Sequence, residues 1–489
     1  MNSRWSSLVI FVSLVAAAGR ANGTPAAACE ALQSALPGRV FFPGSNEYIA
    51  DNEHYYGSSS ETSTCSVEPE SAADVGTILQ VVGSGDTKSP FAIKCGGHAN
   101  GLGFSSTTGV QISLSRLNEV NYDAASSTVK IGAGLAWDEV YNRLSPQGVT
   151  VAGGRVPGVG VGGLLLGGGY GYFTDEYGLS IDNVVAHDLV LPDGTSVEVT
   201  EASDPDLFFS LKGGFNNFGI VTAFTVKTHP QTDVWVATVV NPSNSTAAIQ
   251  AIADFSVNNQ DLKAQITPVY GYTGGGGPQF AVPIFYNGPS PSDVFNGILD
   301  VPGADNLFSG SMTLPQATEA LYGSFVDTPL RGEKHTIPIT HYTVPLIEEM
   351  FAQVDKIAAD AEANGRALIA VSIVMEPFVD PYAHSTPSAY PHPPPPARFS
   401  CPTLLDIHWQ NAADDAYFKN VLKEAQQAIM AKAIEEGQSV PGAILYSNYA
   451  PPDTPPEQLF GAENLARMRQ VRDRVDPGRV MAQTGGFKI

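Results

Sequence analysis

The chain has 489 residues, of which 26 are basic and 49 acidic, so its formal net charge at pH 7 is −23. This acidity disfavours binding to nucleic acid or to an anionic membrane surface, because like charges repel. With 43% hydrophobic residues the chain is expected to fold around packed cores, and its length predicts two or three domains.

The first residues have the order of a secretory signal. Arg4 is followed by an apolar run at 8–18 and then by small residues, which predicts a signal peptide over residues 1–22. A membrane anchor is the alternative, but it would need about 20 apolar residues. We therefore expect a secreted protein, and the sequons at Asn22 and Asn244 fit glycosylation on that route.

Four cysteines allow three pairings, and the sequence does not choose between them. One bridge fits an oxidising compartment, and Cys29 and Cys65, which flank the first segment, are the candidate pair. Cys95 and Cys401 lie among apolar residues and are expected to be buried free thiols. No CxxC or HExxH spacing occurs, so the sequence makes no case for a metal site.

Up to Pro230, hydrophobic periodicity and turn residues predict short strands mixed with helices. This mixture lacks the regular alternation of a doubly wound sheet and indicates an α+β fold. The expected helices are 26–36, 71–82 and 137–144, and the expected strands are 91–94, 110–114, 128–131, 184–191 and 220–228.

Beyond Pro230 the glycine clusters thin out, which predicts a second domain. Helices are expected at 345–364 and 462–474, and strands at 367–374 and 403–408. The run Pro391–Pro396 is interpreted as a rigid surface connection rather than a partner-binding motif.

The stretch 151–183 contains eleven glycines in thirty-three residues, which lets backbone approach a ligand closely. A flexible linker is the alternative, but the interleaved valines and leucines argue against it. Residues 158–163 satisfy GxGxxG, with Asp182 at the distance that a dinucleotide fingerprint asks for. That fingerprint needs a helix at the motif, and the glycines of 167–171 would cost about 1 kcal/mol each in a helix. We therefore expect no helix there and reject a nicotinamide site.

A second glycine-rich loop, Cys95-Gly-Gly-His98, directly follows the strand expected at 91–94. Its glycine amides could hold a pyrophosphate, and His98 could bind a metal, act as a base or be alkylated by a cofactor. A single histidine is more often structural, but two glycine-rich loops in one domain favour a functional interpretation.

These loops and several further motifs resemble the secreted flavin oxidases of the berberine bridge enzyme-like group, within the vanillyl-alcohol oxidase superfamily. The resemblance covers nearly the whole mature chain, and Gly153-Gly-Arg155 and the terminal GGFK are most similar to the fungal branch. The further motifs are Gly178-Leu-Ser-Ile-Asp-Asn183, the segment 206–214, Asn217-Phe-Gly-Ile-Val221, Tyr446-Ser-Asn-Tyr449 and the closing VDPGRVMAQTGGFKI.

The resemblance implies a two-domain fold. A PCMH-type FAD-binding domain would span 23–230, and a substrate domain of antiparallel sheet covered by helices would span 231–445. The segment 446–489 would return to the FAD-binding domain.

The resemblance also implies that His98 carries FAD through a bond to the flavin 8α-methyl group, and that Gly96 and Gly97 hold the pyrophosphate. Many members add a second bond from a cysteine, but that position here is Val156, so we expect a single covalent link. This departure weakens a large oligosaccharide as the substrate. The remaining residues expected at the cofactor are Cys95, Ala99, Gly158, Val159, Gly162, Gly163, Gly169, Ile220 and Asn448.

Two further roles follow from the resemblance. Val159 matches a position that regulates oxygen access, and valine there is associated with oxidases. Tyr170 and Tyr449 match tyrosines that help remove a hydroxyl proton, with Tyr446 as a neighbour. Because a phenol has a pKa near 10, we expect a positive group or a second tyrosine beside the catalytic one.

In the second domain, strand ends suggest a substrate wall of His341, Tyr342, His408 and Trp409, for which core packing is the alternative.

The implied activity is that of a secreted, monomeric oxidase that passes hydride from a small-molecule substrate to FAD and electrons from FAD to O2, giving H2O2. In the fungal branch the substrates are often secondary metabolites, and ring closure sometimes follows oxidation. Three alternatives stay open, namely a carbohydrate oxidase, a dehydrogenase that uses another acceptor, and a secreted protein with a structural flavin. Neither nucleic acid nor a membrane is expected as a partner.

Overall fold

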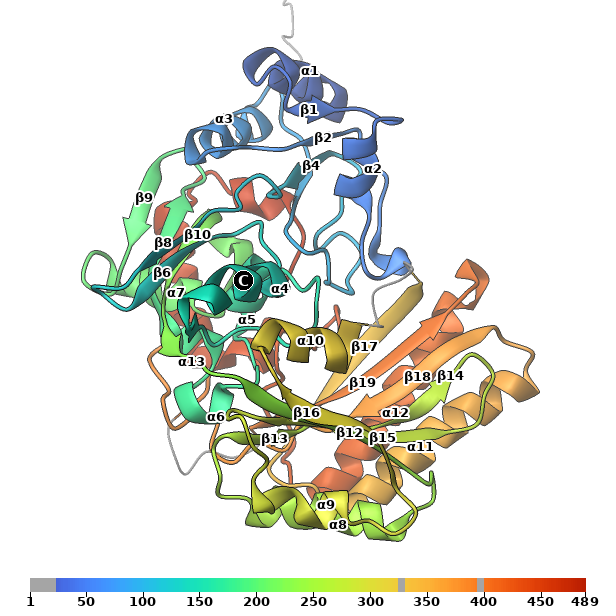
Figure 1. The fold of residues 1–489 in the computed structure, drawn as a ribbon. Helices are drawn as coiled ribbons and strands as arrows, with labels where there is room; N and C mark the ends of the chain where they lie inside the picture. Colours follow the sequence, from blue (N-terminus) through green and yellow to red (C-terminus); the bar gives the residue numbers. More distant parts are fainter. Residues whose placement is uncertain (1–22, 324–329, 394–399) are drawn as a thin grey trace, which may run out of the picture.

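The computed structural model describes residues 23–323, 330–393 and 400–489, so the expected signal peptide, Asn22 and part of the proline run lie outside the described residues. Figure 1 shows two parts, with two sheets in the upper one and a large sheet backed by helices in the lower one. We call them the first and second domains. This mixture of helices and largely antiparallel sheets in two domains confirms the α+β prediction.

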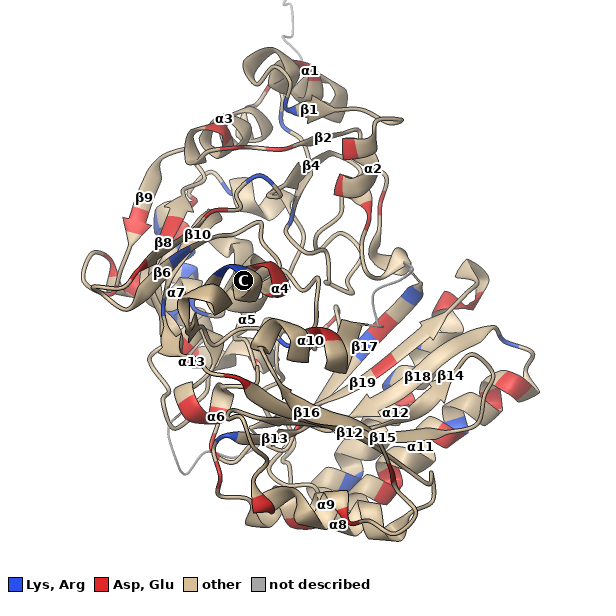
Figure 2. Cartoon of the chain, viewed as in Figure 1, with Lys and Arg blue, Asp and Glu red and all other residues tan. Residues whose placement is uncertain are grey.

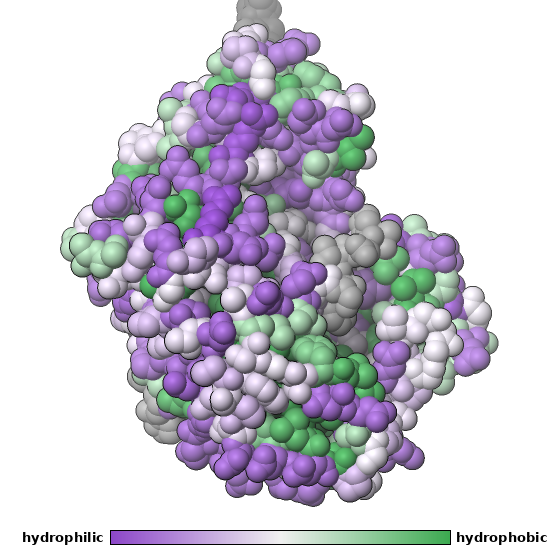
Figure 3. Space-filling model, viewed as in Figure 1, coloured by the Kyte–Doolittle hydropathy of each residue, from purple (hydrophilic) through white to green (hydrophobic). Residues whose placement is uncertain are grey.

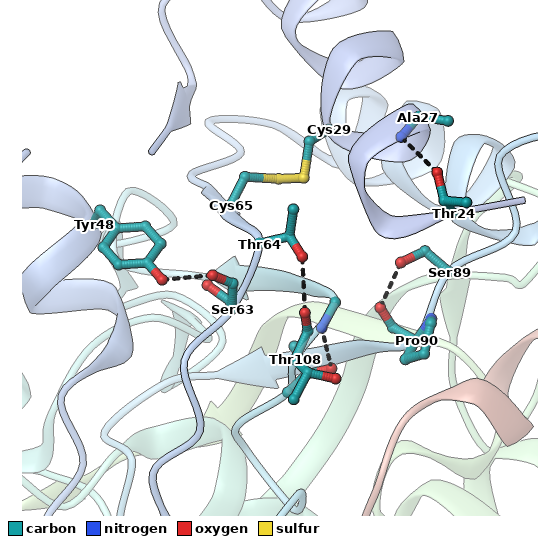
Figure 4. Close-up of a disulfide and its surroundings, with 12 residues drawn as sticks. Thr24, Ala27, Cys29, Tyr48, Ser63, Thr64, Cys65, Ser89, Pro90 and Thr108 are labelled. Atoms are coloured by element: carbon teal, nitrogen blue, oxygen red, sulfur yellow. Dashed lines mark hydrogen bonds between the residues drawn. A yellow bond between two sulfur atoms is a disulfide. The ribbon is translucent and has the colours of Figure 1, made fainter. Parts of the chain in front are cut away.

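The first domain begins with a small four-stranded sheet in the order β1-β2-β4-β3, in which β4 runs parallel to both β2 and β3. Helices α1 and α3 pack together beside this sheet. A disulfide joins Cys29 of α1 to Cys65 of β2 (Figure 4). The candidate pairing is therefore confirmed. The elements are α1 (Pro25–Ala35), β1 (Val40–Phe41), α2 (Asn46–Asn52), β2 (Cys65–Val67), α3 (Ala72–Gly83), β3 (Phe91–Lys94) and β4 (Val110–Ser113).

A second sheet of five antiparallel strands, in the order β5-β6-β10-β8-β9, and a small two-stranded sheet of β7 and β11 complete the first domain. The last long helix, α13, packs against α7, so the end of the chain returns to this domain. The elements are β5 (Val120–Asp123), β6 (Thr128–Gly132), α4 (Trp137–Leu144), β7 (Val149–Thr150), β8 (Val184–Val190), β9 (Ser196–Val199), α7 (Pro205–Leu211), β10 (Ile220–Lys227), β11 (His229–Pro230) and α13 (Pro456–Val475).

The glycine-rich stretch corrects one expectation, because a helix does begin within it. Helix α5 (Val161–Gly167) starts inside the GxGxxG motif and buries Leu165 completely. It stops at Gly168, whose φ is +129°, and Gly169 follows at +90°. Only one of the four clustered glycines is therefore helical, so their combined helix cost does not arise. The short helix α6 (Thr174–Tyr177) follows.

The second domain is built on a large antiparallel sheet in the order β16-β12-β15-β14-β18-β19-β17, with β13 also paired to β15. Helices α11 and α12 pack together against one face, and α8 packs against α11 (Figure 1). The elements are β12 (Val234–Asn241), α8 (Thr246–Asn258), β13 (Ala264–Ile266), β14 (Val269–Thr273), β15 (Gln279–Tyr286), α9 (Asn296–Leu299), β16 (Asp305–Met312), α10 (Leu314–Tyr322), β17 (Arg331–Ile339), α11 (Val344–Ala363), β18 (Leu368–Val374), β19 (Cys401–Trp409) and α12 (Asp415–Glu435).

The two faces of this sheet have different surroundings. On β19, Leu405 and Ile407 are fully buried against the helices, while Leu404, Asp406 and His408 are half-buried on the opposite face. Successive side chains of a strand point to opposite faces, so the second set faces the first domain. Within the described ranges, no helix is long and apolar enough to cross a membrane.

Candidate active site

A cavity of about 340 Å³ lies between the two domains. The first domain contributes the loop after β3, the glycine-rich stretch, and residues from the end of the chain. The second domain contributes Lys334 of β17 together with Leu404 and Asp406 of β19. The cavity is therefore complete only when both domains and the C-terminal segment are in place.

The two glycine-rich loops touch each other through their backbones at the cavity wall. A Cβ atom on Gly96 would lie 2.4 Å from the Gly160 nitrogen, and one on Gly160 would lie 2.3 Å from the Gly96 nitrogen. Neither position tolerates a side chain. A Cβ on Gly163 would meet no atom within 4 Å, so the backbone there is open to the cavity.

His98 lies in the first of these loops, and Tyr55 stacks on its imidazole with 4.5 Å between ring centroids. Burial, and then the charges of Lys334 and Lys94, lower the pKa of His98 to about 3. The imidazole is therefore neutral near pH 7, with an unprotonated nitrogen. A neutral imidazole is the form that can act as a nucleophile or a base.

The three candidate tyrosines have different surroundings. The Tyr446 hydroxyl accepts hydrogen bonds from the backbone N–H of Gly169 at 3.2 Å and from Asn448 Nδ2 at 3.0 Å, so it ties the C-terminal segment to the glycine-rich stretch. The Tyr170 hydroxyl is hydrogen-bonded to that of Tyr382 at 2.7 Å. Both hydroxyls thus have structural partners.

Tyr449 differs, because its neighbours in the cavity are charged. Lys334 Nζ lies 5.7 Å from the centroid of its ring. Burial, and then the carboxylate of Glu376, hold the pKa of Tyr449 well above its usual value, while the guanidinium of Arg155 acts in the opposite direction. Tyr449 is therefore a neutral phenol at rest, beside a carboxylate that attracts its proton.

Arg155 and Glu376 form a buried ion pair beside Tyr449, with side chains only 7% and 1% exposed. Arg155 belongs to the glycine-rich stretch, and Glu376 follows β18, so the pair joins the two domains. Arg155 Nη1 has no hydrogen-bond partner among the described residues, and Arg155 lines the cavity. The site therefore offers a polar ligand a charged donor.

A second polar network borders His98. Asp406 accepts a hydrogen bond from the Tyr56 hydroxyl at 2.8 Å and pairs with His408 Nε2 at 2.9 Å. Burial alone would raise the pKa of Asp406, but His408, Tyr56 and Lys334 outweigh it and hold the pKa below its usual value. Burial also lowers the pKa of Lys334 to about 8, although Asp406 opposes the shift.

Comparison with known proteins identifies the family. Residues 63–200 match the model of the FAD binding domain. The chain is 32% identical over 477 residues to FAD-dependent monooxygenase drtC of Aspergillus calidoustus, an alignment that covers 94% of this chain and 89% of the relative. It is 30% identical to FAD-dependent monooxygenase sdcF of Emericella nidulans, covering 94% and 98%.

The chain belongs to the berberine bridge enzyme-like family of FAD-linked oxidoreductases. Solved structures share its fold. Xylooligosaccharide oxidase from Myceliophthora thermophila has a TM-score of 0.77 at 18% identity, covering 94% of this chain and 99% of that one. Berberine bridge enzyme has a TM-score of 0.75 at 15% identity, covering 94% and 99%.

The residues of this oxidoreductase fit FAD. The close backbone contact of Gly96 with Gly160 and the open backbone at Gly163 form a cradle that side chains would fill, and Arg155 Nη1 has a free donor. The candidates that line the cavity are Cys95, Gly96, Gly97, His98, Ala99, Val159, Gly162, Gly163, Ile220 and Asn448, together with Tyr170, Tyr446, Tyr449 and Val156.

Two cofactor candidates lie outside the cavity lining. Gly158 is behind His98, since its Cβ would be 3.6 Å from His98 Nε2. Gly169 packs against Ser180 and donates its N–H to Tyr446. Cys95 and Cys401 are free thiols as expected, but only Cys401 is fully buried, because Cys95 faces the cavity.

The residues suggested for a substrate wall do not line the cavity. Trp409 stacks on Phe418 of α12, on the helix-covered face. Tyr342 is fully buried and hydrogen-bonded to Thr403. His341 is bonded to the Ser256 carbonyl, and His408 lies behind Tyr56, so core packing accounts for this group.

Two tyrosines and four charged residues of the oxidoreductase site were not predicted from the sequence. The tyrosines are Tyr55 and Tyr56, and the charged residues are Arg155 as a site residue, Lys334, Glu376 and Asp406. A charged residue within or next to an otherwise apolar strand is a sequence signal that identifies some of these site residues. Asp406 lies in CPTLLDIHW, and Glu376 directly follows the apolar strand LIAVSIV and Met375.

Proposed function

We propose that this FAD-linked oxidoreductase is a secreted oxidase of a neutral, largely apolar alcohol, with FAD attached at His98, O2 as the acceptor and Tyr449 as the proton acceptor. The observation that carries the proposal is the position of Tyr449 in the cavity beside the buried Arg155–Glu376 pair. H2O2 formation, ring closure of the product and Val159 as the oxygen gate belong to the same proposal and rest on the family resemblance.

When bound, FAD would accept hydride from the substrate carbon and pass two electrons to O2. The residues of the chain would handle the proton. Tyr449 would accept the hydroxyl proton of the substrate while its own phenol proton moves to the Glu376 carboxylate. Arg155 would hold the Glu376 carboxylate in place through their ion pair, and burial of the pair would exclude water. This relay avoids a free tyrosinate, which the raised pKa of Tyr449 disfavours.

An apolar row supports the proposed substrate class. Leu404, Val374, Val269, Ala281 and Val240 lie opposite one another across β19, β18, β14, β15 and β12. Residues directly opposite in antiparallel strands share a face, and all five are half-buried. Leu404 lines the cavity, so the row begins at the site.

The strands that carry this row contain few charges. Strands β12, β14, β15 and β18 have no charged residue and are tan throughout in Figure 2. In the view of Figure 3, apolar residues gather on the lower part of the molecule, which is the second domain. A neutral apolar substrate fits this face better than an oligosaccharide, whose hydroxyl groups would need hydrogen-bonding partners.

Secretion is supported by the Cys29–Cys65 disulfide, since such bridges persist in oxidising compartments, and by the exposure of Asn244 at the second sequon.

The test is a substrate screen with the purified holoenzyme. The holoenzyme is mixed anaerobically with aromatic and terpenoid alcohols and, in a separate series, with neutral oligosaccharides. Bleaching of the flavin absorption band is followed before air is admitted. The proposal predicts bleaching by members of the alcohol panel and one H2O2 per substrate oxidised. Bleaching by oligosaccharides alone would overturn the substrate class, and negligible reoxidation in air would indicate a dehydrogenase.

A further inference from the structure

Tyr55 makes a contact that the proposed chemistry does not use. Its ring lies nearly parallel to the His98 imidazole, with an interplanar angle of 16° and 4.5 Å between centroids. Its backbone N–H donates to the Gly97 carbonyl at 3.2 Å, so the contact is anchored beside the histidine. A stacked imidazole cannot turn about its side-chain bonds without pushing its edge into the phenol ring. Tyr55 therefore restricts the direction of the His98 nitrogens.

Tyr55 is itself held from the second domain. The ring of Tyr56 meets it edge-on at 4.8 Å, and His408 meets it edge-on at 5.9 Å. Tyr56 is fixed in turn by its hydrogen bond to Asp406 and by stacking on His408 at 5.5 Å. The following Ser58 exchanges hydrogen bonds with the backbone of Gly332 in β17. The stacking platform under His98 is thus tied to β17 and β19.

Lys334, also on β17, holds the backbone of the same histidine. Its Nζ donates to the His98 carbonyl at 3.2 Å, and Asn100 Nδ2 donates to the Lys334 carbonyl at 3.0 Å. The ring and the main chain of His98 are therefore positioned by different residues. Both supports depend on the second domain.

We propose that Tyr55 and Lys334 are positioning residues for covalent attachment of FAD, and that docking of the second domain completes the attachment site. This inference rests on the proposed bond at His98. In that step an imidazole nitrogen bonds to the flavin 8α carbon, which loses a C–H proton, while the imidazole loses its N–H proton. The electron pair of the broken C–H bond reduces the flavin, and O2 then takes up that electron pair and the two released protons to form H2O2.

The experiment measures covalent flavin per bound flavin in the full chain. Each purified variant is incubated with excess FAD, total flavin is determined, and attachment is followed by in-gel fluorescence and by flavin retained in the acid-precipitated protein. We expect Tyr55→Leu to attach flavin on the order of tenfold more slowly, since a misplacement of about 1 Å can cost about a hundredfold in rate. Tyr55→Phe keeps the ring and should attach at the wild-type rate. Lys334→Met should also attach flavin more slowly than the wild-type protein.

A second stacked pair provides the matched control. Tyr177 stacks on His229 at 3.6 Å and an angle of 2°, outside the cavity lining. Tyr177→Leu removes a comparable stack and should leave attachment unchanged, so an equal slowing there would overturn the inference. If Tyr55→Leu or Lys334→Met attaches flavin at the wild-type rate, the residue concerned has no positioning role. If Tyr55→Leu is insoluble, Lys334→Met still tests the proposal.

The variant His98→Ala separates the positioning roles of Tyr55 and Lys334 from the proposed attachment of FAD at His98, on which they rest. If His98→Ala still retains flavin after acid precipitation, the attachment residue is wrong and the positioning roles fall with it. If His98→Ala loses covalent flavin while Tyr55→Leu attaches normally, only the positioning role is wrong.

Discussion

Arg155 and Glu376 form a buried ion pair 221 residues apart in the sequence, and this pair joins the glycine-rich stretch to the end of β18. It also places a carboxylate next to Tyr449 in the cavity wall. This ion pair is thus one of the contacts that hold the two domains together, and it contributes to the electrostatic surroundings of the proposed proton acceptor.

Removing one partner of this pair should destabilise the protein strongly. Arg155→Met leaves the Glu376 carboxylate buried and unpaired, which costs about 3–5 kcal/mol of unfolding free energy. Urea unfolding of Arg155→Met, Glu376→Met and the double variant measures this cost. The double variant should recover part of the loss, because it leaves no unpaired charge. Additive losses in the double variant would mean that the two side chains do not interact.

Tyr449→Phe should slow reduction of the flavin by substrate and leave reoxidation in air nearly unchanged. A positioned proton acceptor contributes about 10²–10⁴-fold to the rate. Rapid mixing under anaerobic and then aerobic conditions measures the two steps separately. Tyr417→Phe, on α12 and outside the cavity lining, is the control. Equal slowing of both steps by Tyr449→Phe would remove its assignment as proton acceptor.

His187 should make the protein less stable as the pH falls. It is completely buried between Phe208 and Phe224, and burial and then Lys212 lower its pKa to about 3. Between about pH 6.5 and pH 3 the unfolded chain binds a proton that the folded chain excludes, so stability falls with decreasing pH. The contribution is about 1.4 kcal/mol per pH unit in that window.

His187→Leu removes this contribution and should flatten the pH dependence. Neither imidazole nitrogen has a hydrogen-bond partner among the described residues, so an apolar replacement leaves no donor or acceptor unpaired. Urea unfolding of both proteins from pH 7 to pH 4 is the measurement. Parallel curves would show that His187 is protonated in the folded state.

The disulfide should stabilise the start of the first domain. Cys29 and Cys65 are 36 residues apart, and closing a loop of that length stabilises the fold by about 4 kcal/mol in the chain-entropy treatment. The double variant Cys29→Ala with Cys65→Ala should lose that amount in urea unfolding. Cys401→Ala, which removes a buried free thiol, is the control for the loss of a cysteine side chain.

The sequence predicted the parts of the site that depend on local signals. The glycine loops and His98 are short and contiguous signals, and a change of composition near Pro230 predicts a second domain, whereas the Tyr446-Ser-Asn-Tyr449 motif was indicated by the family resemblance alone. The expectation of no helix at Val161 failed because it counted glycines that lie beyond the helix end.

Long-range contacts could not be predicted in this way. Lys334 meets His98 across 236 residues, and nothing near Lys334 in the sequence indicates that pairing. Tyr55 precedes the glycine loops in an ordinary polar segment, and its ring contacts with His98 and with His408 of β19 arise only in the folded chain. Single charges in apolar strands, such as Asp406, are the signal that comes nearest to predicting such residues.

Mass spectrometry of the peptide that contains His98, taken from the acid-precipitated protein after digestion, tests the covalent attachment most directly. We expect a single FAD on that peptide, located at His98 by fragmentation, and no flavin on the peptide that contains Val156. An unmodified His98 peptide, with all flavin released into the acid supernatant, would contradict covalent attachment at His98.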